Sequence, residues 1–256
     1  MITVKGLVIS RRDIGENDCV INILTAEYGV MEIYVRGARK LTAKNNSSTQ
    51  LFAYSTFCIN EQKEKYYLNS SEPIRVFYEL RLDVKKYALA CYFVEISQYC
   101  IPRGETAQNV MQLLLNSLHF LAEDLRSCAY LKCVFEMRFM SEVGLLPQLI
   151  GCRDCYQYIT EEMYIMIDRA CLLCGDDFER RDFEEDYYHI RINNTVLHSL
   201  RFICLAELKR VFNFKVGEDN QRLLNEITEK YILRHLSHQF KALDFYKEIC
   251  EETNSV

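Results

Sequence analysis

The stretches Cys152-Arg-Asp-Cys155 and Cys171-Leu-Leu-Cys174, separated by fifteen residues, place two close pairs of thiols in one short region of the chain. Two Cys-x2-Cys pairs at this separation are a usual ligand set for one tetrahedral zinc ion. Four protein ligands leave no open position for water or substrate, so we expect one structural zinc ion bound by Cys152, Cys155, Cys171 and Cys174. The alternative of two unrelated redox or disulfide pairs fits the spacing less well.

Hydrophobic periodicity divides the rest of the chain into a β part and helical parts. Residues 1–80 contain five short, mostly alternating apolar runs, which predict a small closed barrel. An OB-fold is the form we expect, although a different small β-barrel would leave a similar pattern. From 81 to 149 and from 191 to 256 the apolar residues repeat at helical spacing. We therefore expect an α+β protein whose helical domain is interrupted by a zinc finger at 150–190.

Positive charge gathers in one loop after the third expected strand. No Asp or Glu occurs from residue 33 to 60, whereas four cations fall within nine residues: Arg36, Arg39, Lys40 and Lys44. Such a loop can follow a phosphate backbone, and nearby aromatic side chains can stack on unpaired bases. The aromatic candidates are Tyr34, Phe52 and Tyr54. The alternative is a solvated loop beside ordinary core aromatics.

The charge of the whole chain limits any binding to nucleic acid. The formal net charge is -5, which is the wrong sign for coating DNA by bulk attraction, so phosphate contacts must be local. Arg11 and Arg12 are weaker candidates for DNA contact, because three carboxylates follow them closely and partly cancel their charge. These carboxylates belong to Asp13, Glu16 and Asp18.

The sequence lacks the usual signatures of catalysis and of membrane insertion. It contains no glycine-rich phosphate loop, no His-Glu-x-x-His and no Gly-x-Ser-x-Gly, so we expect no enzyme. The start of the chain has no signal-like segment, and no window holds eighteen uncharged apolar residues. We expect a cytoplasmic protein without membrane contact.

Several strings carry a resemblance that covers nearly the whole chain. They are Lys5-Gly-Leu-Val-Ile9, Arg11-Arg-Asp-Ile-Gly-Glu16, Leu24-Thr25 with Tyr28-Gly29, Arg36-Gly-Ala-Arg-Lys40, Phe135-Glu-Met-Arg138, Gly144-Leu-Leu-Pro147, the four cysteines, and His235-Leu-Ser-His-Gln-Phe-Lys-Ala-Leu243. Their order and spacing resemble the RecO family of bacterial recombinational repair proteins.

This resemblance implies an N-terminal OB-fold, a helical domain and, in many members, a zinc module. It also implies a nucleoid-associated, non-enzymatic mediator that binds single- and double-stranded DNA and anneals complementary strands. The implied partners are RecR, the acidic tail of single-stranded-DNA-binding protein and, indirectly, RecA. Arg36, Arg39 and Lys40 match the family's basic segment. The net negative charge of the chain does not fit a protein that binds DNA by charge alone. It suggests that RecR supplies part of the DNA-binding surface.

A second interpretation assigns the protein to another class. An acidic chain with a large helical domain also fits an adaptor that works at single-stranded-DNA-binding protein with only incidental DNA contact. The resemblance suggests a groove for the acidic tail in the helical domain, with Lys132 or Arg138 as partners of its carboxylates. From the sequence alone, either residue can equally be an ordinary solvated helix residue.

Overall fold

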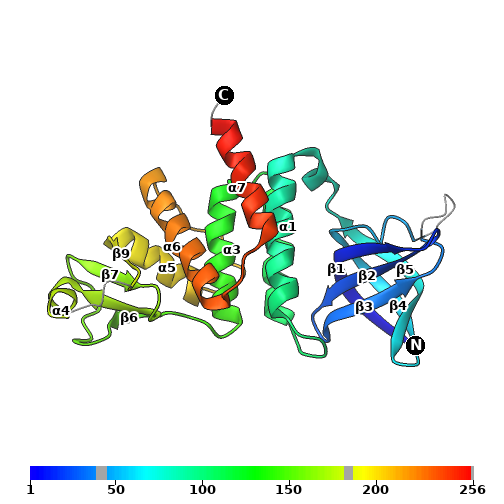
Figure 1. The fold of residues 1–256 in the computed structure, drawn as a ribbon, viewed down its shortest axis with the longest axis horizontal. Helices are drawn as coiled ribbons and strands as arrows, with labels where there is room; N and C mark the ends of the chain where they lie inside the picture. The colour runs from blue at the N-terminus through cyan, green and yellow to red at the C-terminus, as the bar shows by residue number, and fades with distance from the viewer. Residues whose placement is uncertain (39–44, 182–186, 255–256) are drawn as a thin grey trace. The chain divides into compact units, whose positions relative to one another are not determined.

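The computed structural model describes residues 1–38, 45–181 and 187–254 (Figure 1). Its contacts define two compact units. Unit 1 consists of Met1–Leu125 together with Phe240–Val256, and unit 2 consists of Arg126–Gln239. No helix within the described ranges combines the length and the apolar content of a membrane span.

Unit 1 begins with a closed five-stranded barrel. The strands are β1 (Ile2–Ile14), β2 (Asp18–Thr25), β3 (Gly29–Val35), β4 (Ala53–Gln62) and β5 (Lys65–Val76). They follow the order β1-β2-β3-β5-β4, and β1 pairs with β4 to close the barrel. A five-stranded barrel in which β3 and β5 run parallel is the arrangement of an OB-fold, so the expected fold class is confirmed.

Alternation along the strands separates the barrel interior from its outer face. In β3, Met31, Ile33 and Val35 belong to the buried core, while Tyr34 between them is only half-buried. Successive side chains of a strand point to opposite faces, so Tyr34 lies on the outer face. The core is filled mainly by apolar residues of the other strands, including Val4, Val8, Ile21, Ile23, Phe57 and Ile59.

Helices complete unit 1. They are the 3-10 helix η1 (Tyr78–Leu82), α1 (Val84–Cys100), α2 (Gln108–Ala122) and α7 (Lys241–Asn254). Asp83 caps α1 by accepting hydrogen bonds from the amides of Lys85 and Lys86 at 2.8 and 3.0 Å. Helix α7 packs against α1, as Figure 1 shows, and its first amides, those of Lys241 and Ala242, donate to the Glu95 carboxylate at 3.3 and 2.9 Å.

The turn between β2 and β3 fixes the barrel to the segment that follows α1. Gly29 has φ of 59°, and a Cβ there would overlap the Pro102 carbonyl oxygen and lie 2.8 Å from that of Glu105. The Gly104 amide donates to the Tyr28 carbonyl at 2.9 Å, so the backbones meet directly. Only glycine combines this positive φ with so close an approach.

Unit 2 is built around helix α3. It contains α3 (Cys128–Glu142), β6 (Gln148–Cys152), β7 (Met163–Met166), β8 (Cys171–Cys174), α4 (Gly175–Glu179), β9 (His189–Ile192), α5 (Asn194–Leu205) and α6 (Glu218–Leu236). Every residue from 130 to 140 is buried, as expected for a helix that is apolar nearly all round. The four strands form one sheet of order β6-β8-β7-β9.

The contacts divide the helices differently from the predicted domains. The sequence predicts one helical domain, comprising 81–149 and 191–256, with 150–190 inserted in it. In the structure, α1, α2 and α7 belong with the barrel, whereas α3, α5 and α6 belong with the inserted sheet. Similar helical periodicity on both sides of an insert does not say which helices share a core.

The close approach at Gly29 yields a stability prediction. We expect Gly29→Ala to lower the free energy of unfolding by about 3 kcal/mol, because the new Cβ adds steric overlap to the cost of a left-handed backbone. Gly15 is a matched control, since its φ is 58° and a Cβ there would meet no atom within 4 Å. Gly15→Ala should cost only about 1 kcal/mol. Urea unfolding followed by circular dichroism measures both, and equal losses would contradict the packing argument.

Candidate functional site

A cluster of three thiols and one carboxylate lies at the edge of the unit 2 sheet. Cys152 ends β6, Cys155 follows in a turn, Cys174 ends β8, and Asp177 lies in α4 immediately after it. One ligand atom from each of these residues lies within 4.8 Å of the others, so the cluster could hold a metal ion. The sheet brings the cluster together because β6 and β8 are neighbouring strands.

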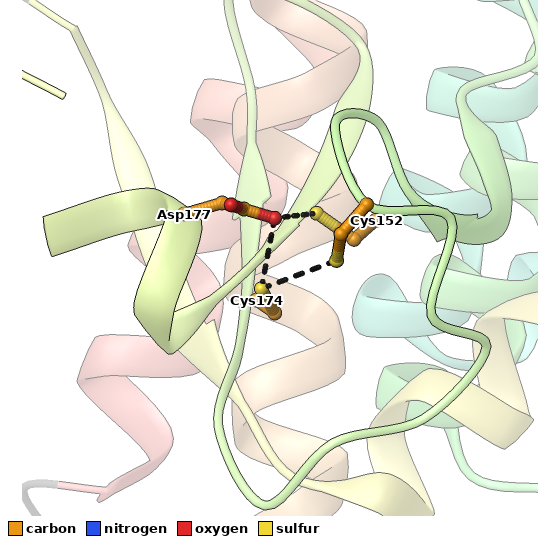
Figure 2. Close-up of side chains that lie close together, drawn as sticks. Cys152, Cys174 and Asp177 are labelled. Atoms are coloured by element: carbon orange, nitrogen blue, oxygen red, sulfur yellow. Dashed lines mark hydrogen bonds between the residues drawn. The ribbon is translucent and has the colours of Figure 1, made fainter. Parts of the chain in front are cut away.

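The Asp177 carboxylate lies close to two of the thiols. Its Oδ2 is 3.1 Å from the Sγ of Cys152 and 3.1 Å from the Sγ of Cys174, and Figure 2 shows the carboxylate pointing toward both. Cys155 Sγ lies 3.6 Å from Cys174 Sγ. The four side chains therefore converge on one point from β6, the turn after it, β8 and α4.

The turn that carries Cys155 has little free space. The Tyr156 amide donates to the Cys152 carbonyl at 3.0 Å, and the Cys152 amide donates to the Gln157 carbonyl at 2.9 Å. A Cβ on Gly151 would lie only 2.8 Å from that Gln157 carbonyl oxygen. The chain therefore folds back closely on itself, which directs Cys155 toward Cys174.

Cys171 is not part of this cluster, so the predicted set of four cysteines differs from the structure. Cys171 and Cys174 are three residues apart in β8, and an extended strand directs side chains at odd spacing to opposite faces. Asp177 is the fourth member of the cluster instead. Cys174-x2-Asp177 repeats the spacing of Cys152-x2-Cys155, and carboxylates are metal ligands too, so the sequence contained this signal.

The cluster perturbs the ionisation of its members. Hydrogen bonds from the thiols of Cys155, Cys152 and Cys174 lower the pKa of Asp177 to about 2. Burial raises the pKa of the Cys174 thiol to about 12. Without a metal, the carboxylate is therefore charged and the Cys174 thiol keeps its proton, which a bound metal ion would displace.

The cations predicted to contact DNA are only partly covered by the structure. Arg36 follows β3 and is exposed. Arg12 is exposed on β1, whereas the adjacent Arg11 is half-buried with its Nε 3.7 Å from Asp13. The other three predicted cations, Arg39, Lys40 and Lys44, lie outside the described residues.

The strand register places Arg12 and Tyr34 on one face. Arg12 pairs with Val20 across β1 and β2, and Val20 pairs with Tyr34 across β2 and β3. Residues paired directly across strands share a face, so Arg12 belongs to the same outer face as Tyr34.

The aromatic residues predicted to stack on bases have different surroundings. Tyr34 is half-buried on the outer face of β3, and Tyr54 is half-buried on β4. Phe52 has an exposed fraction of 0% and packs its ring against Tyr87. Phe52 is therefore a core residue and is inaccessible to a base, which corrects the prediction for this residue.

Lys132 does not face solvent or an approaching peptide. Its side chain is 5% exposed, and its Nζ lies 2.8 Å from Glu136 and 2.9 Å from Glu229 on α6. Thr228 Oγ1 donates to the second oxygen of Glu136 at 2.6 Å. The predicted partner of a tail carboxylate is instead held by two carboxylates of the protein itself.

Arg138 also has an internal role. Its Nε contacts Glu142 at 2.7 Å, and its Nη1 donates to carbonyl groups at the C-terminal end of α5, including that of Ile203 at 3.1 Å. A cation at this position satisfies carbonyls that have no partner within their helix. Both proposed partner residues thus join α3 to its neighbours, which corrects their expected role.

The fold and the site define a class of protein: an OB-type barrel linked to helices and to a small sheet with a cysteine-rich cluster. Comparison with protein families makes this specific. The family model described as "Recombination protein O N terminal" matches residues 1–77, and "Recombination protein O C terminal" matches residues 81–244. The chain therefore belongs to the RecO family of DNA repair proteins.

Curated relatives match along nearly their whole length. "DNA repair protein RecO" of Acetivibrio thermocellus is 28% identical over 245 residues, which cover 96% of each chain. The protein of the same name from Alkaliphilus metalliredigens is 26% identical, covering 97% of this chain and 100% of that protein. That of Caldicellulosiruptor saccharolyticus is 23% identical, covering 97% and 98%.

The cluster yields a prediction about metal content. We expect Cys174→Ser and Asp177→Ala each to weaken metal binding by at least about tenfold, because even residues that only support a ligand contribute that much. Cys171→Ser should retain one metal ion per chain, and Asp177→Cys should bind more tightly in competition with a chelator. Metal analysis by mass spectrometry measures these outcomes. Equal loss of metal in Cys171→Ser and Cys174→Ser would instead support the predicted ligand set of four cysteines.

Proposed function

We propose that the protein is a non-enzymatic mediator of recombinational DNA repair that binds single- and double-stranded DNA and anneals complementary strands. The observation that carries this proposal is the outer face of the barrel, where Arg12, Arg36 and Lys65 are exposed. Residues 33–60, which include Arg36 and most of β4, contain no Asp or Glu, whereas Arg12 is followed by Asp13 and Lys65 is preceded by Glu64. Membership of a family of DNA repair proteins supports the same conclusion.

Annealing by such a surface requires no covalent chemistry. Cations that neutralise the phosphates of two strands lower their mutual repulsion and raise their local concentration. The bases remain free to pair because the contacts are made to the backbone. A small basic surface on an acidic chain binds weakly by itself, so we propose that RecR supplies part of the DNA surface and that the two proteins together help to load RecA.

The metal in the cluster is proposed to be a single structural zinc ion. Two thiolates on a tetrahedral zinc ion with bonds of about 2.3 Å lie about 3.8 Å apart. The 3.6 Å between Cys155 Sγ and Cys174 Sγ is close to this value. Cys152, Cys155, Cys174 and Asp177 would fill all four positions, so the ion would supply a link between β6, β8 and α4 rather than a reactive site.

The DNA proposal is tested by removing charge from the basic segment. We expect Arg36→Ala/Arg39→Ala/Lys40→Ala to weaken binding to single-stranded DNA. The slope of log affinity against log salt should become shallower by about 2, because three phosphate contacts contribute about 0.7 each. Annealing of complementary oligonucleotides should slow in parallel. Fluorescence anisotropy at several salt concentrations, with and without RecR, provides the measurement.

A matched variant controls for the change in total charge. Lys209→Ala/Arg210→Ala/Lys241→Ala removes the same charge from exposed residues outside the barrel. This variant should retain both affinity and slope. If the two variants lose affinity equally, total charge rather than this surface governs DNA binding.

An adaptor that binds the acidic tail of single-stranded-DNA-binding protein is the second candidate. A groove of about 530 Å³ in unit 2 favours it. We call it the α3–α6 groove; the residues that matter here are Arg126, Tyr130, Phe214, Lys215 and Arg222. The rings of Tyr130 and Phe214 lie 4.9 Å apart. Lys215 and Arg222 line the groove with positive charge, although Glu218 lines it too and its carboxylate lies 3.9 Å from Arg222. The groove lies at the N-terminal ends of two helices, which favour negative charge.

Charge reversal in the α3–α6 groove tests the adaptor function. We expect Lys215→Glu to weaken binding of a labelled acidic-tail peptide by about tenfold, because it places like charge against the peptide. Lys209→Glu makes the same change at an exposed residue outside the groove and should have no effect. Titration of the peptide onto the full chain is the measurement. Absence of saturable binding to the wild type would count against this function.

A further inference from the structure

Four side chains of β3, β5 and the residue after β3 form a row on the outer face of the barrel. Tyr34 and Tyr67 are register partners of the parallel strands β3 and β5. Their neighbours Ile33 and Tyr66 pack toward the barrel core, so the two tyrosines point outward. Along the chain, Arg36 lies two residues after Tyr34 and Lys65 lies two residues before Tyr67, and both cations lie over the rings on this outer face. We call these four residues the tyrosine row.

Each ring in the tyrosine row contacts the other ring and one cation. The ring centroids of Tyr34 and Tyr67 are 5.5 Å apart, with an interplanar angle of 36°. The Arg36 guanidinium carbon is 4.9 Å from the Tyr67 centroid, and Lys65 Nζ is 5.1 Å from the Tyr34 centroid. Both distances are within the range of cation–π contact. The cations are exposed and the tyrosines half-buried, so the rings are held in place while the charges remain accessible.

The surface beside the row is hollowed. A groove of about 480 Å³ is lined by Tyr34 and Lys65, and also by Glu32, Glu64 and Arg103. Glu32 and the exposed Glu64 would repel phosphate, although Arg103 lies 3.5 Å from the Glu32 carboxylate. A nucleic acid strand is therefore best accommodated with its phosphates toward Arg36 and Lys65 and a base toward the rings. Arg12 adds a further exposed cation, because it shares a register row with Tyr34 through Val20.

We propose that the tyrosine row is a base-stacking platform that gives DNA binding a preference for unpaired bases. The inference rests on the proposed DNA-binding function. It adds which form of DNA the site prefers, namely strands with unpaired bases. The faces of bases in a duplex are covered by their neighbours, whereas those of a single strand can stack on an aromatic ring. Flexible Arg36 and Lys65 side chains can transfer to phosphates when a base reaches the rings, and guanidinium groups also stack on bases.

The test compares two labelled strands on the full-length protein. One is a 20-nucleotide thymidine strand, and the other has the same length and phosphates but abasic sugars. The wild type should bind the base-bearing strand at least about fivefold more tightly, as expected for one stacked base. Tyr34→Leu/Tyr67→Leu should reduce this ratio to near one and leave the salt slope unchanged, because the phosphate contacts remain.

Two control variants separate stacking from loss of structure. Tyr34→Phe/Tyr67→Phe keeps both rings and should retain the preference for bases. Tyr78→Leu removes an exposed ring that is outside the row and should also retain it. Circular dichroism establishes that each variant is folded. If Tyr34→Leu/Tyr67→Leu does not fold, the ratio of the wild-type affinities for the base-bearing and abasic strands decides whether bases contribute to binding.

The outcomes separate this inference from the function on which it rests. Equal wild-type affinity for the two strands, or an unchanged ratio in folded Tyr34→Leu/Tyr67→Leu, would overturn the stacking platform while DNA binding stands. Failure of the wild type to bind either strand, even with RecR present, would overturn both.

Discussion

The parallel pairing of β3 with β5 is the contact on which the barrel depends. The other neighbouring strands run antiparallel, and this pairing joins the β1-β2-β3 meander to the β4-β5 hairpin. Its register places Ile33 beside Tyr66 on the interior side and Tyr34 beside Tyr67 on the exterior. A shift of one residue would exchange the two sets, burying a cation-bearing face and exposing core residues. The register that closes the barrel is therefore the same one that creates its outer row of tyrosines and cations.

Unit 2 depends on a different constraint, which is that its buried charged side chains must each have a partner within the protein. Lys132 lies between Glu136 and Glu229, and Arg138 donates a hydrogen bond to a carbonyl near the C-terminal end of α5. Buried ion pairs contribute little net stability, but each member is costly to leave unpaired. This network therefore selects one arrangement of α3, α5 and α6. The cluster around Asp177 selects one arrangement of the sheet in a similar way, because its polar atoms satisfy one another.

The sequence predicted those features that depend on local pattern. The five barrel strands follow from the alternating apolar runs, and the helical structure of α3 follows from apolar residues at helical spacing. Periodicity does not reveal strand register, so the pairing of Tyr67 with Tyr34 could not be anticipated. The candidate ligands at 171, 174 and 177 share one spacing, and only the alternation of side chains along β8 separates Cys171 from the cluster. The internal pairing of Lys132 was predictable in part. A charged residue on a helix that is apolar nearly all round is buried and must find a partner within the protein.

The connection of the chain gives unit 2 the character of an insertion. The chain leaves unit 1 after α2 and completes it only when residues 240–254 return to it. Glu95 accepts hydrogen bonds from the first amides of α7. During synthesis, domains generally fold as they emerge, with N-terminal parts first. Here the barrel, α1 and α2 emerge early, yet the side of α1 that α7 covers stays bare until all of unit 2 has been made. A ribosome that stalls within unit 2 would thus leave an apolar helix face open to chaperones.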